Sequence, residues 1–235
     1  MARTVIDAHE LSKTYTEGPV PVEAVKDVHL HIEAGEFIAL VGPSGSGKTT
    51  LLNMIGGLDE PTKGKVVIDG TDITGMKENK LIDFRLRNIG FVFQAYNLIP
   101  VLTAEENIEF IMLLQGTDKD ERKQRVQQLL EEVGLQGKGS SRPSELSGGQ
   151  QQRVAVARAL ASKPKFVLAD EPTANLDSTT AANLLDIMEK LNKEEGMTFV
   201  FSTHDPRVIQ RARRVVTLVD GEIEKDEMVN EPMVD

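Results

Sequence analysis

Two glycine-rich segments of the sequence combine residue types that bind phosphate groups. The first reads GPSGSGKT from Gly42 to Thr49, and the second reads LSGGQ from Leu146 to Gln150. A glycine-rich turn at the start of a helix directs unpaired backbone N–H groups and the positive end of the helix dipole at an anion. A single nucleotide has no obvious need for both segments, so one of them is left without an evident phosphate.

The first segment has the composition of a phosphate-binding loop. Its glycines let the backbone approach a phosphate, Lys48 can neutralise charge on the β- and γ-phosphates, and the Thr49 hydroxyl can ligate Mg²⁺. The apolar run Glu36 to Val41 precedes it and helix-forming residues follow from Lys48 to Ile55, which is the strand–loop–helix context that such a loop requires. The predicted nucleotide-binding residues of this loop are Gly42, Pro43, Ser44, Gly45, Ser46, Gly47, Lys48, Thr49 and Thr50.

Two consecutive acidic residues follow another apolar run. Asp170 comes directly after Phe166 to Ala169, so its carboxylate is expected at the carboxyl end of a buried strand, where parallel sheets place their ligands. There Asp170 can organise Mg²⁺, and Glu171 can accept a proton from the water that attacks a γ-phosphate. The alternative is a solvated acidic turn before Pro172, which the apolar strand and the phosphate loop disfavour.

The elements expected to position these residues are those of an α/β fold. Short apolar runs typical of a buried parallel sheet occur at Ile89 to Phe93, Phe166 to Ala169 and Phe199 to Phe201. Between the last two, apolar residues at helical spacing end at Gly196 and predict a helix, which completes a right-handed βαβ unit. The apolar positions of that helix are Ala181, Leu184, Leu185, Met188 and Leu191.

A helical lobe is predicted from Leu98 to about Ala161. Its clearest apolar stripe consists of Val126, Leu129, Leu130 and Val133. Within the lobe, Ser147, Gly148 and Gly149 precede a helix expected to begin near Gln150, so they can donate hydroxyl and N–H contacts to a γ-phosphate. The simpler interpretation is a serine N-cap followed by glycines.

Composition narrows the range of partners. The 235 residues include 40% hydrophobic residues, which is enough for a packed core. The net charge of −10 argues against a general nucleic-acid or anionic-membrane surface, and the absence of cysteine excludes disulfides and thiolate metal sites. No stretch approaches the roughly 18 apolar residues of a membrane span, so any membrane role is expected to come through a partner.

In combination, these motifs resemble those of the ATPase subunits of ATP-binding-cassette (ABC) transporters. The resemblance extends over nearly the whole chain, with GPSGSGKT, LSGGQ and LADEPTANLD (Leu168 to Asp177) in the family's order. It implies a P-loop NTPase (RecA-like) core with an antiparallel β subdomain and an inserted α-helical signature subdomain, and it implies ATP and Mg²⁺ as ligands. In the family, the LSGGQ segment of one subunit closes over ATP held by the other subunit. The resemblance therefore implies an ATP-sandwich homodimer in which the residues acting in trans are Ser147, Gly148, Gly149 and Gln150.

The resemblance also assigns two residues that flank the nucleotide. Tyr15 matches the position whose ring stacks on adenine, although alone it is more typical of an edge-strand aromatic. Gln94 matches the Q-loop glutamine, a neutral oxygen ligand for Mg²⁺ that acts through water together with Thr49 and Asp170. Without the family, Gln94 is a polar strand end.

Two further motifs are assigned in the same way. His204 matches the switch histidine, which would hold the γ-phosphate and align Glu171 with the attacking water, whereas a lone histidine at a strand end is more often structural. Asn175, Leu176 and Asp177 match the D-loop at the dimer seam, with an asparagine before the Leu-Asp pair as a mild variation. Catalysis is thus assigned to Glu171 and His204.

The apolar segment Gln94 to Thr103 lies at the entry to the helical lobe. In ABC transporters this region receives the coupling helix of an integral membrane permease-type subunit, which we expect as a partner. The alternative is that Leu98, Ile99 and Leu102 simply pack the lobe.

Two sequence segments most resemble the LolD/MacB/FtsE branch: VFQAYNLIPVLTAEEN (Val92 to Asn107) and RPSELSGGQQQRVAVARAL (Arg142 to Leu160). This implies lipoprotein release or macrolide or peptide efflux, at the cytoplasmic face of the inner membrane. An FtsE-like regulator that transports nothing is the alternative. A soluble ABC ATPase of DNA repair or translation is disfavoured by the single cassette and the net charge of −10, and no nucleic-acid partner is expected.

The expected organisation is one ABC ATPase domain over residues 1–235. Residues 1–96 and 162–225 are expected to form the RecA-like core with the antiparallel β subdomain, and residues 97–161 the helical subdomain. Residues 226–235 are acidic and lack periodicity, so we expect a flexible tail there.

Overall fold

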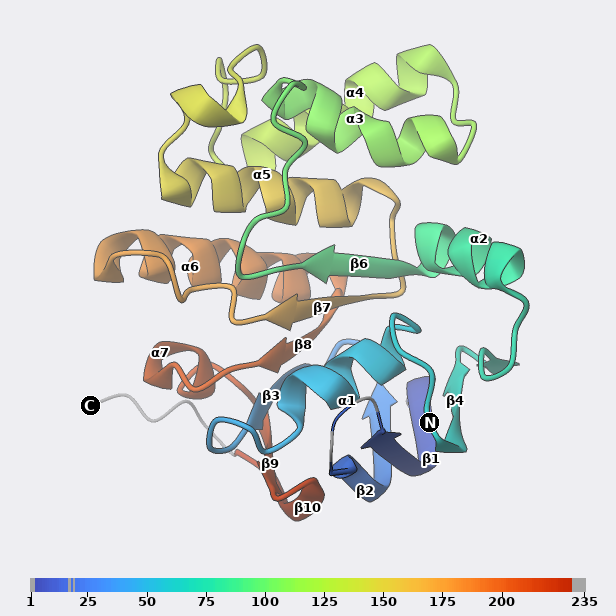
Figure 1. The fold of residues 1–235 in the computed structure, drawn as a ribbon. Helices are drawn as coiled ribbons and strands as arrows, with labels where there is room; N and C mark the ends of the chain where they lie inside the picture. The colour runs from blue at the N-terminus through green and yellow to red at the C-terminus, as the bar shows by residue number, and fades with distance from the viewer. Residues whose placement is uncertain (1–2, 17, 19, 230–235) are drawn as a thin grey trace.

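Two β-sheets and their helices are stacked in layers in the computed structural model of the chain, which describes residues 3–16, 18 and 20–229 (Figure 1). The larger sheet consists of β3 (Phe37–Val41), β6 (Ile89–Val92), β7 (Phe166–Asp170), β8 (Thr198–Ser202), β9 (Arg214–Val219) and β10 (Glu222–Met228). Its strand order is β10-β9-β3-β8-β7-β6, with β10 antiparallel to β9 and the other neighbours parallel. The strands predicted from the apolar runs are confirmed.

The smaller sheet is antiparallel and has the order β2-β1-β4-β5. Its strands are β1 (Thr4–Tyr15), β2 (Val22–Glu33), β4 (Lys63–Ile68) and β5 (Thr71–Asp72). Helix α1 (Lys48–Ile55) lies between the two sheets and contacts β1 and β2 on one side and β7 and β8 on the other. The phosphate loop therefore enters a helix that both sheets hold in place.

The remaining helices lie on the other face of the larger sheet or at its end (Figure 1). They are α2 (Glu78–Asn88), α3 (Ala104–Leu114), α4 (Lys119–Glu132), α5 (Gly148–Ala161), α6 (Ser178–Glu195) and α7 (Pro206–Ile209), with a 3₁₀ turn at Pro143–Glu145. Helix α6 ends as predicted at Gly196, whose φ of 67° is readily adopted by glycine. Helix α5 begins at Gly148, earlier than predicted, because Ser147 caps it.

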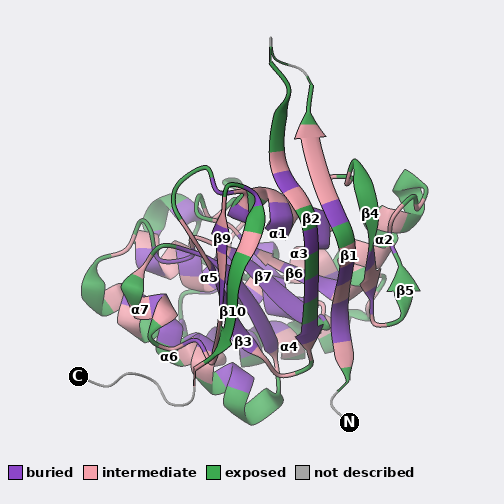
Figure 2. Cartoon of the chain, turned by 90° about the horizontal axis from the view of Figure 1, so that it is seen from below, coloured by how far each residue is buried: buried purple, intermediate pink, exposed green. Residues whose placement is uncertain are grey.

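Apolar side chains alternate between two cores on the two faces of the larger sheet. On β7, Phe166 and Leu168 face the core shared with α1 and the smaller sheet, while Val167 and Ala169 face the core shared with α5 and α6. A strand covered on both faces is apolar at every position, which explains why these runs lack polar alternation. Figure 2 shows this central sheet as a band of buried residues.

The structure differs from expectation in two places, at helix α2 and at the end of strand β10. Helix α2 was not predicted, because its sequence is largely polar and none of its residues is fully buried, although Leu81 and Phe84 pack against the core. The expected tail begins too early, since Asp226 to Met228 pair with β9 as part of β10; residues 230–235 lie outside the described residues. In the part of the chain that the structure describes, no helix is both long and apolar enough to cross a membrane.

We predict that Phe201→Ala strongly destabilises the fold. Phe201 is fully buried on β8, with its ring centroid 4.7 Å from that of Phe37 and 5.9 Å from that of Phe199. Loss of a buried phenyl ring leaves a cavity, so the free energy of unfolding should fall by about 3 to 5 kcal/mol. Chemical denaturation measures this change. Val22→Ala, at an exposed strand position, is the control and should change it by less than about 0.5 kcal/mol; a similar small loss for Phe201→Ala would contradict the prediction.

Candidate active site

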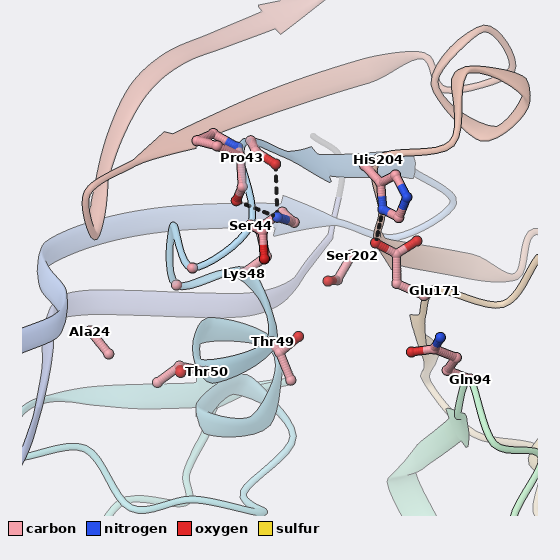
Figure 3. Close-up of a pocket in the computed structure, with 13 residues that line it drawn as sticks. Ala24, Pro43, Ser44, Lys48, Thr49, Thr50, Gln94, Glu171, Ser202 and His204 are labelled. Atoms are coloured by element: carbon pink, nitrogen blue, oxygen red, sulfur yellow. Dashed lines mark hydrogen bonds and ion pairs between the residues drawn. The ribbon is translucent and has the colours of Figure 1, made fainter. Parts of the chain in front are cut away.

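A cavity of about 520 Å³ opens at the carboxyl edge of the larger sheet (Figure 3). It is lined by Ala24, Gly42, Pro43, Ser44, Gly45, Gly47, Lys48, Thr49, Thr50, Gln94, Glu171, Ser202 and His204. The lining combines the phosphate loop with the strand ends of β6, β7 and β8. The buried Ser202 hydroxyl, which has no hydrogen-bond partner among the described residues, is one of these groups and suits a polar ligand.

The phosphate loop requires glycine at two positions. Gly42 has a φ of 148° and Gly47 a φ of 100°; a Cβ on Gly42 would overlap the carbonyl oxygen of Leu218, and one on Gly47 would overlap that of Ala24. The Lys48 ammonium folds back over the loop, where its Nζ donates to the Gly42 oxygen at 2.8 Å and to the Pro43 oxygen at 3.0 Å. These acceptors are neutral, so the positive charge of Lys48 stays available for a phosphate.

The oxygen ligands expected for a metal come from two sides of the cavity. The Thr49 hydroxyl, on the first turn of α1, donates to Asp170 Oδ1 at 3.2 Å, and Gln94 lies opposite α1 beside Glu171 (Figure 3). Among the described residues no cluster of three or more His, Asp or Glu could hold a metal by itself. One carboxylate with hydroxyl and amide oxygens suits Mg²⁺, which is usually shared between a protein and substrate phosphates.

Glu171 and His204 face each other across the open side of the cavity. His204 Nδ1 lies 2.6 Å from Glu171 Oε1, and the Thr203 hydroxyl donates to Glu171 Oε2 at 3.0 Å. The Glu171 backbone has a φ of 44°, and its N–H donates to the Ser202 oxygen at 2.8 Å. A left-handed conformation at a glutamate costs free energy, so the surrounding bonds hold Glu171 in place against this strain.

Asp205 fixes the loop that carries His204, although sequence analysis did not identify it. Its carboxylate accepts hydrogen bonds from the Thr173 hydroxyl and from the Arg207 guanidinium. Burial alone would raise the pKa of Asp205, but the hydrogen bonds from Arg207 and Thr173 outweigh burial and lower that pKa to about 2. The loops after β7 and β8 are therefore tied together at neutral pH. The only sequence signal was its position next to His204.

Three of the residues predicted to bind nucleotide within the same copy do not line the cavity. Tyr15 is 39% exposed, and its hydroxyl donates to Asp59 Oδ2 at 2.6 Å while Lys13 Nζ lies 5.0 Å from its ring centroid. Stacking of Tyr15 on adenine stays a prediction. Ser46 is buried beneath the loop, and Asp170 reaches the cavity only through Thr49.

The LSGGQ segment is held outside this cavity. Ser147 and Gln150 form a capping box, in which Ser147 Oγ accepts from the Gln150 N–H at 3.3 Å and Gln150 Oε1 accepts from the Ser147 N–H at 3.0 Å. The N-cap interpretation is thus correct locally. A Cβ on Gly149 would overlap Thr180 of α6, so packing also requires this glycine. Ser147 remains exposed.

Asn175, one of the residues predicted to form the D-loop, and Arg158 of α5 bind the segment that follows β6. The Asn175 side-chain amide donates to the Gln94 carbonyl oxygen at 2.9 Å, and Arg158 donates to the carbonyl oxygens of Tyr96, at 2.9 Å, and Asn97. Tyr96 and Asn97 have φ values of 60° and 50°, so Arg158 stabilises two consecutive strained residues.

The other two D-loop residues are placed separately. Asp177 caps α6 by accepting from the Thr180 N–H at 3.0 Å, and Leu176 packs against the core on the face of the larger sheet that α5 and α6 cover. Hydrogen bonds from Thr180 lower the pKa of Asp177, so the cap is ionised at neutral pH.

Comparison with known proteins agrees with this geometry. A family model described as ABC transporter matches residues 25–174. The chain is 42% identical to the lipoprotein-releasing system ATP-binding protein LolD of Idiomarina loihiensis, over 97% of this chain and 100% of that one. It is 44% identical to the macrolide export ATP-binding/permease protein MacB of Mannheimia succiniciproducens, over 94% of this chain and 34% of that one.

A solved structure gives the same result. The ATP-binding cassette MJ0796 of Methanocaldococcus jannaschii, a dimer in a post-hydrolysis state bound to ADP and Pi, matches with a TM-score of 0.88 and 44% identity over 95% of this chain and 98% of that chain. The chain therefore belongs to the ABC transporter family, as an ATP-binding cassette that hydrolyses ATP.

Proposed function

We propose that two copies of this chain close head to tail over ATP and Mg²⁺ and that hydrolysis drives a membrane partner. The observation that carries the proposal is the division of phosphate-binding parts within one chain. Lys48, Glu171 and His204 share one cavity, whereas the exposed Ser147 at the start of α5 lies outside it. A second copy supplies the missing part in this arrangement, and MJ0796 was itself solved as a dimer.

The residues of the cavity divide the work of phosphoryl transfer. Lys48 exchanges its hydrogen bonds to the carbonyl oxygens of its own loop for bonds to the β- and γ-phosphates. Glu171 accepts a proton from the attacking water. His204 holds Glu171 and contacts the γ-phosphate. Thr49, Gln94 and Asp170 would hold Mg²⁺, in part through water, and the ion would supply positive charge to the phosphate oxygens.

The partner docks, in this proposal, in an apolar groove of about 460 Å³ near Gln94 to Thr103. We call it the docking groove; its lining residues are Leu58, Ile82, Arg85, Leu86, Ile89, Gly90, Phe91, Phe93, Asn97, Ile99, Phe110, Ile111, Arg158, Ala159 and Ser162. Leu58 and Ile82 are 42% and 47% exposed, which is typical of an interaction surface. Leu98 instead packs against the core, as the alternative interpretation holds.

The relatives support a transporter of the lipoprotein-release or macrolide-efflux type, acting at the cytoplasmic face of the inner membrane through an integral membrane permease. In MacB a permease is part of the same protein by name, and the chain covers 34% of its length. An FtsE-like regulator remains the second candidate. Residues 97–161 form the signature subdomain in this proposal, because α3, α4 and α5 pack chiefly on one another, and residues 1–96 and 162–225 form the rest of the cassette.

We predict that Glu171→Gln retains ATP binding but loses turnover. The amide keeps the shape of the side chain and cannot accept the proton, so kcat should fall by about 10² to 10⁴. Phosphate release and nucleotide binding are measured side by side, and gel filtration with ATP and Mg²⁺ should show a lasting dimer. Glu194→Gln, at an exposed position on α6, is the control. Normal turnover by Glu171→Gln would remove Glu171 from the catalytic role.

We also predict that Ser147 acts in trans. In the Glu171→Gln background, Ser147→Asp keeps a good N-cap and so preserves α5, but it adds a carboxylate where the γ-phosphate of the other copy should lie. Gel filtration with ATP and Mg²⁺ should then show monomer. Ser140→Asp, at an exposed loop position, serves as the control and should dimerise. A Ser147→Asp dimer as abundant as the control would rule out the composite site.

A further inference from the structure

The docking groove contains only positive charge. Among its lining residues Arg85 and Arg158 are the charged ones, and none is Asp or Glu. The whole chain has a net charge of −10, so a groove without a carboxylate is a local exception to the acidic composition. Two guanidinium groups in an apolar surface form a site for an anion that is itself carried on an apolar surface.

Arg158 is the more informative of the two arginines. Two other arginines with little exposure are paired with carboxylates: Arg122 lies 2.8 Å from Glu109, and Arg214 lies 2.9 Å from Glu36. Burial lowers the pKa of Arg158, and no carboxylate in the described part of the chain opposes this effect. Its hydrogen bonds go to two neutral carbonyls, those of Tyr96 and Asn97. Since a largely buried cation is normally paired, Arg158 is a guanidinium without a counter-ion among the residues that the structure describes.

We propose that the segment of the membrane partner that enters the docking groove is an amphipathic helix with a carboxylate that binds Arg158. This inference rests on the proposed function, because it names the chemistry of the partner that docks there. The apolar lining from α2, β6 and α3 receives the apolar face of the helix. An aspartate or glutamate beside that face then forms a charge-assisted pair with the guanidinium.

The same guanidinium gives docking a direct route to the nucleotide cavity. Arg158 holds the Tyr96 and Asn97 carbonyls, and Asn175 holds the carbonyl of Gln94. A Cβ on Gly148 would lie 2.9 Å from the Tyr96 hydroxyl, so the tyrosine ring touches the start of the LSGGQ helix. A carboxylate on Arg158 therefore acts on a segment that contacts the Q-loop, the D-loop and the signature. If the ion pair between the partner's carboxylate and Arg158 is more stable in one nucleotide state than in another, docking favours that state.

The test uses three synthetic helical peptides with one apolar face, identical except for a Glu, Gln or Lys beside that face. Their binding to the full chain is measured by fluorescence anisotropy. The Glu peptide should bind about tenfold more tightly than the Gln peptide, because a charge-assisted hydrogen bond is roughly twice as strong as a neutral one, and the Lys peptide should bind most weakly. Salt should bring the affinities of the Glu and Lys peptides closer to that of the Gln peptide, because it screens both the attraction and the repulsion.

Matched variants assign the preference to one residue. Arg158→Gln should abolish it, and Arg158→Lys, which keeps the charge and one donor, should retain part of it. Arg153→Gln is the control, because Arg153 lies on the same helix outside the groove and donates to the Val133 carbonyl. If the Glu preference disappears in Arg85→Gln but persists in Arg158→Gln, the assignment to Arg158 is overturned.

A further variant separates this inference from the proposed function. Leu58→Asp should weaken all three peptides, because it places a charge in the apolar lining. If the three peptides bind with equal affinity and all three lose binding in Leu58→Asp, the proposed carboxylate is contradicted but the docking groove is supported. If Leu58→Asp changes no affinity, or the Glu peptide does not bind the unmodified chain, both the groove and the carboxylate are overturned.

Discussion

The burial of three central parallel strands, β3, β7 and β8, on both faces is the constraint from which the arrangement of the site follows. Strands β3, β7 and β8 are buried along nearly their whole length, so polar side chains can project only where the strands end. Parallel neighbours end at the same edge. The phosphate loop after β3, Asp170 at the end of β7 and Ser202 at the end of β8 are therefore neighbours, although they are far apart in sequence.

Turns with unusual backbone geometry convert this shared edge into a site. Gly42, Gly47 and Glu171 all have positive φ values, and each follows a buried strand directly or within a short loop. Hydrogen bonds across the edge compensate for the strain: Glu171 is bound by Ser202, Thr203 and His204, and Asp205 joins the loops after β7 and β8. The fold itself thereby positions the Glu171 carboxylate, and in the proposed mechanism this lowers the cost of reorganisation during reaction.

The sequence predicted the parts of this arrangement that depend on local pattern. Lys48 and Asp170 were found because an apolar strand precedes each and a strand end is a local feature. The roles of Asp205 and Arg158 were missed, and so was the hydrogen bond from the Asn175 side-chain amide to Gln94. Each of these side chains binds a segment that is distant in sequence, and such contacts leave no periodic signal. Helix α2 was missed for a related reason: it lies at the rim of the docking groove and buries none of its residues fully. Tyr15 matched a family motif, yet its hydroxyl is bound to Asp59 and its ring lies beyond the cavity lining.

Exposure explains why a single copy forms an incomplete enzyme under the proposed mechanism. The Glu171 side chain is 16% exposed, but that of His204, which binds it, is 77% exposed. Water at this open side screens the charges that must act on a γ-phosphate, and the same pair is far stronger when water is excluded. A second copy placing Ser147 and the start of α5 over the open side would both add phosphate donors and lower the local dielectric constant. Dimer closure and hydrolysis are then coupled, because Glu171 and His204 act on the γ-phosphate at full electrostatic strength only when the cavity is covered. This dependence allows a docking segment that acts on Arg158, far from the γ-phosphate, to influence the rate of hydrolysis.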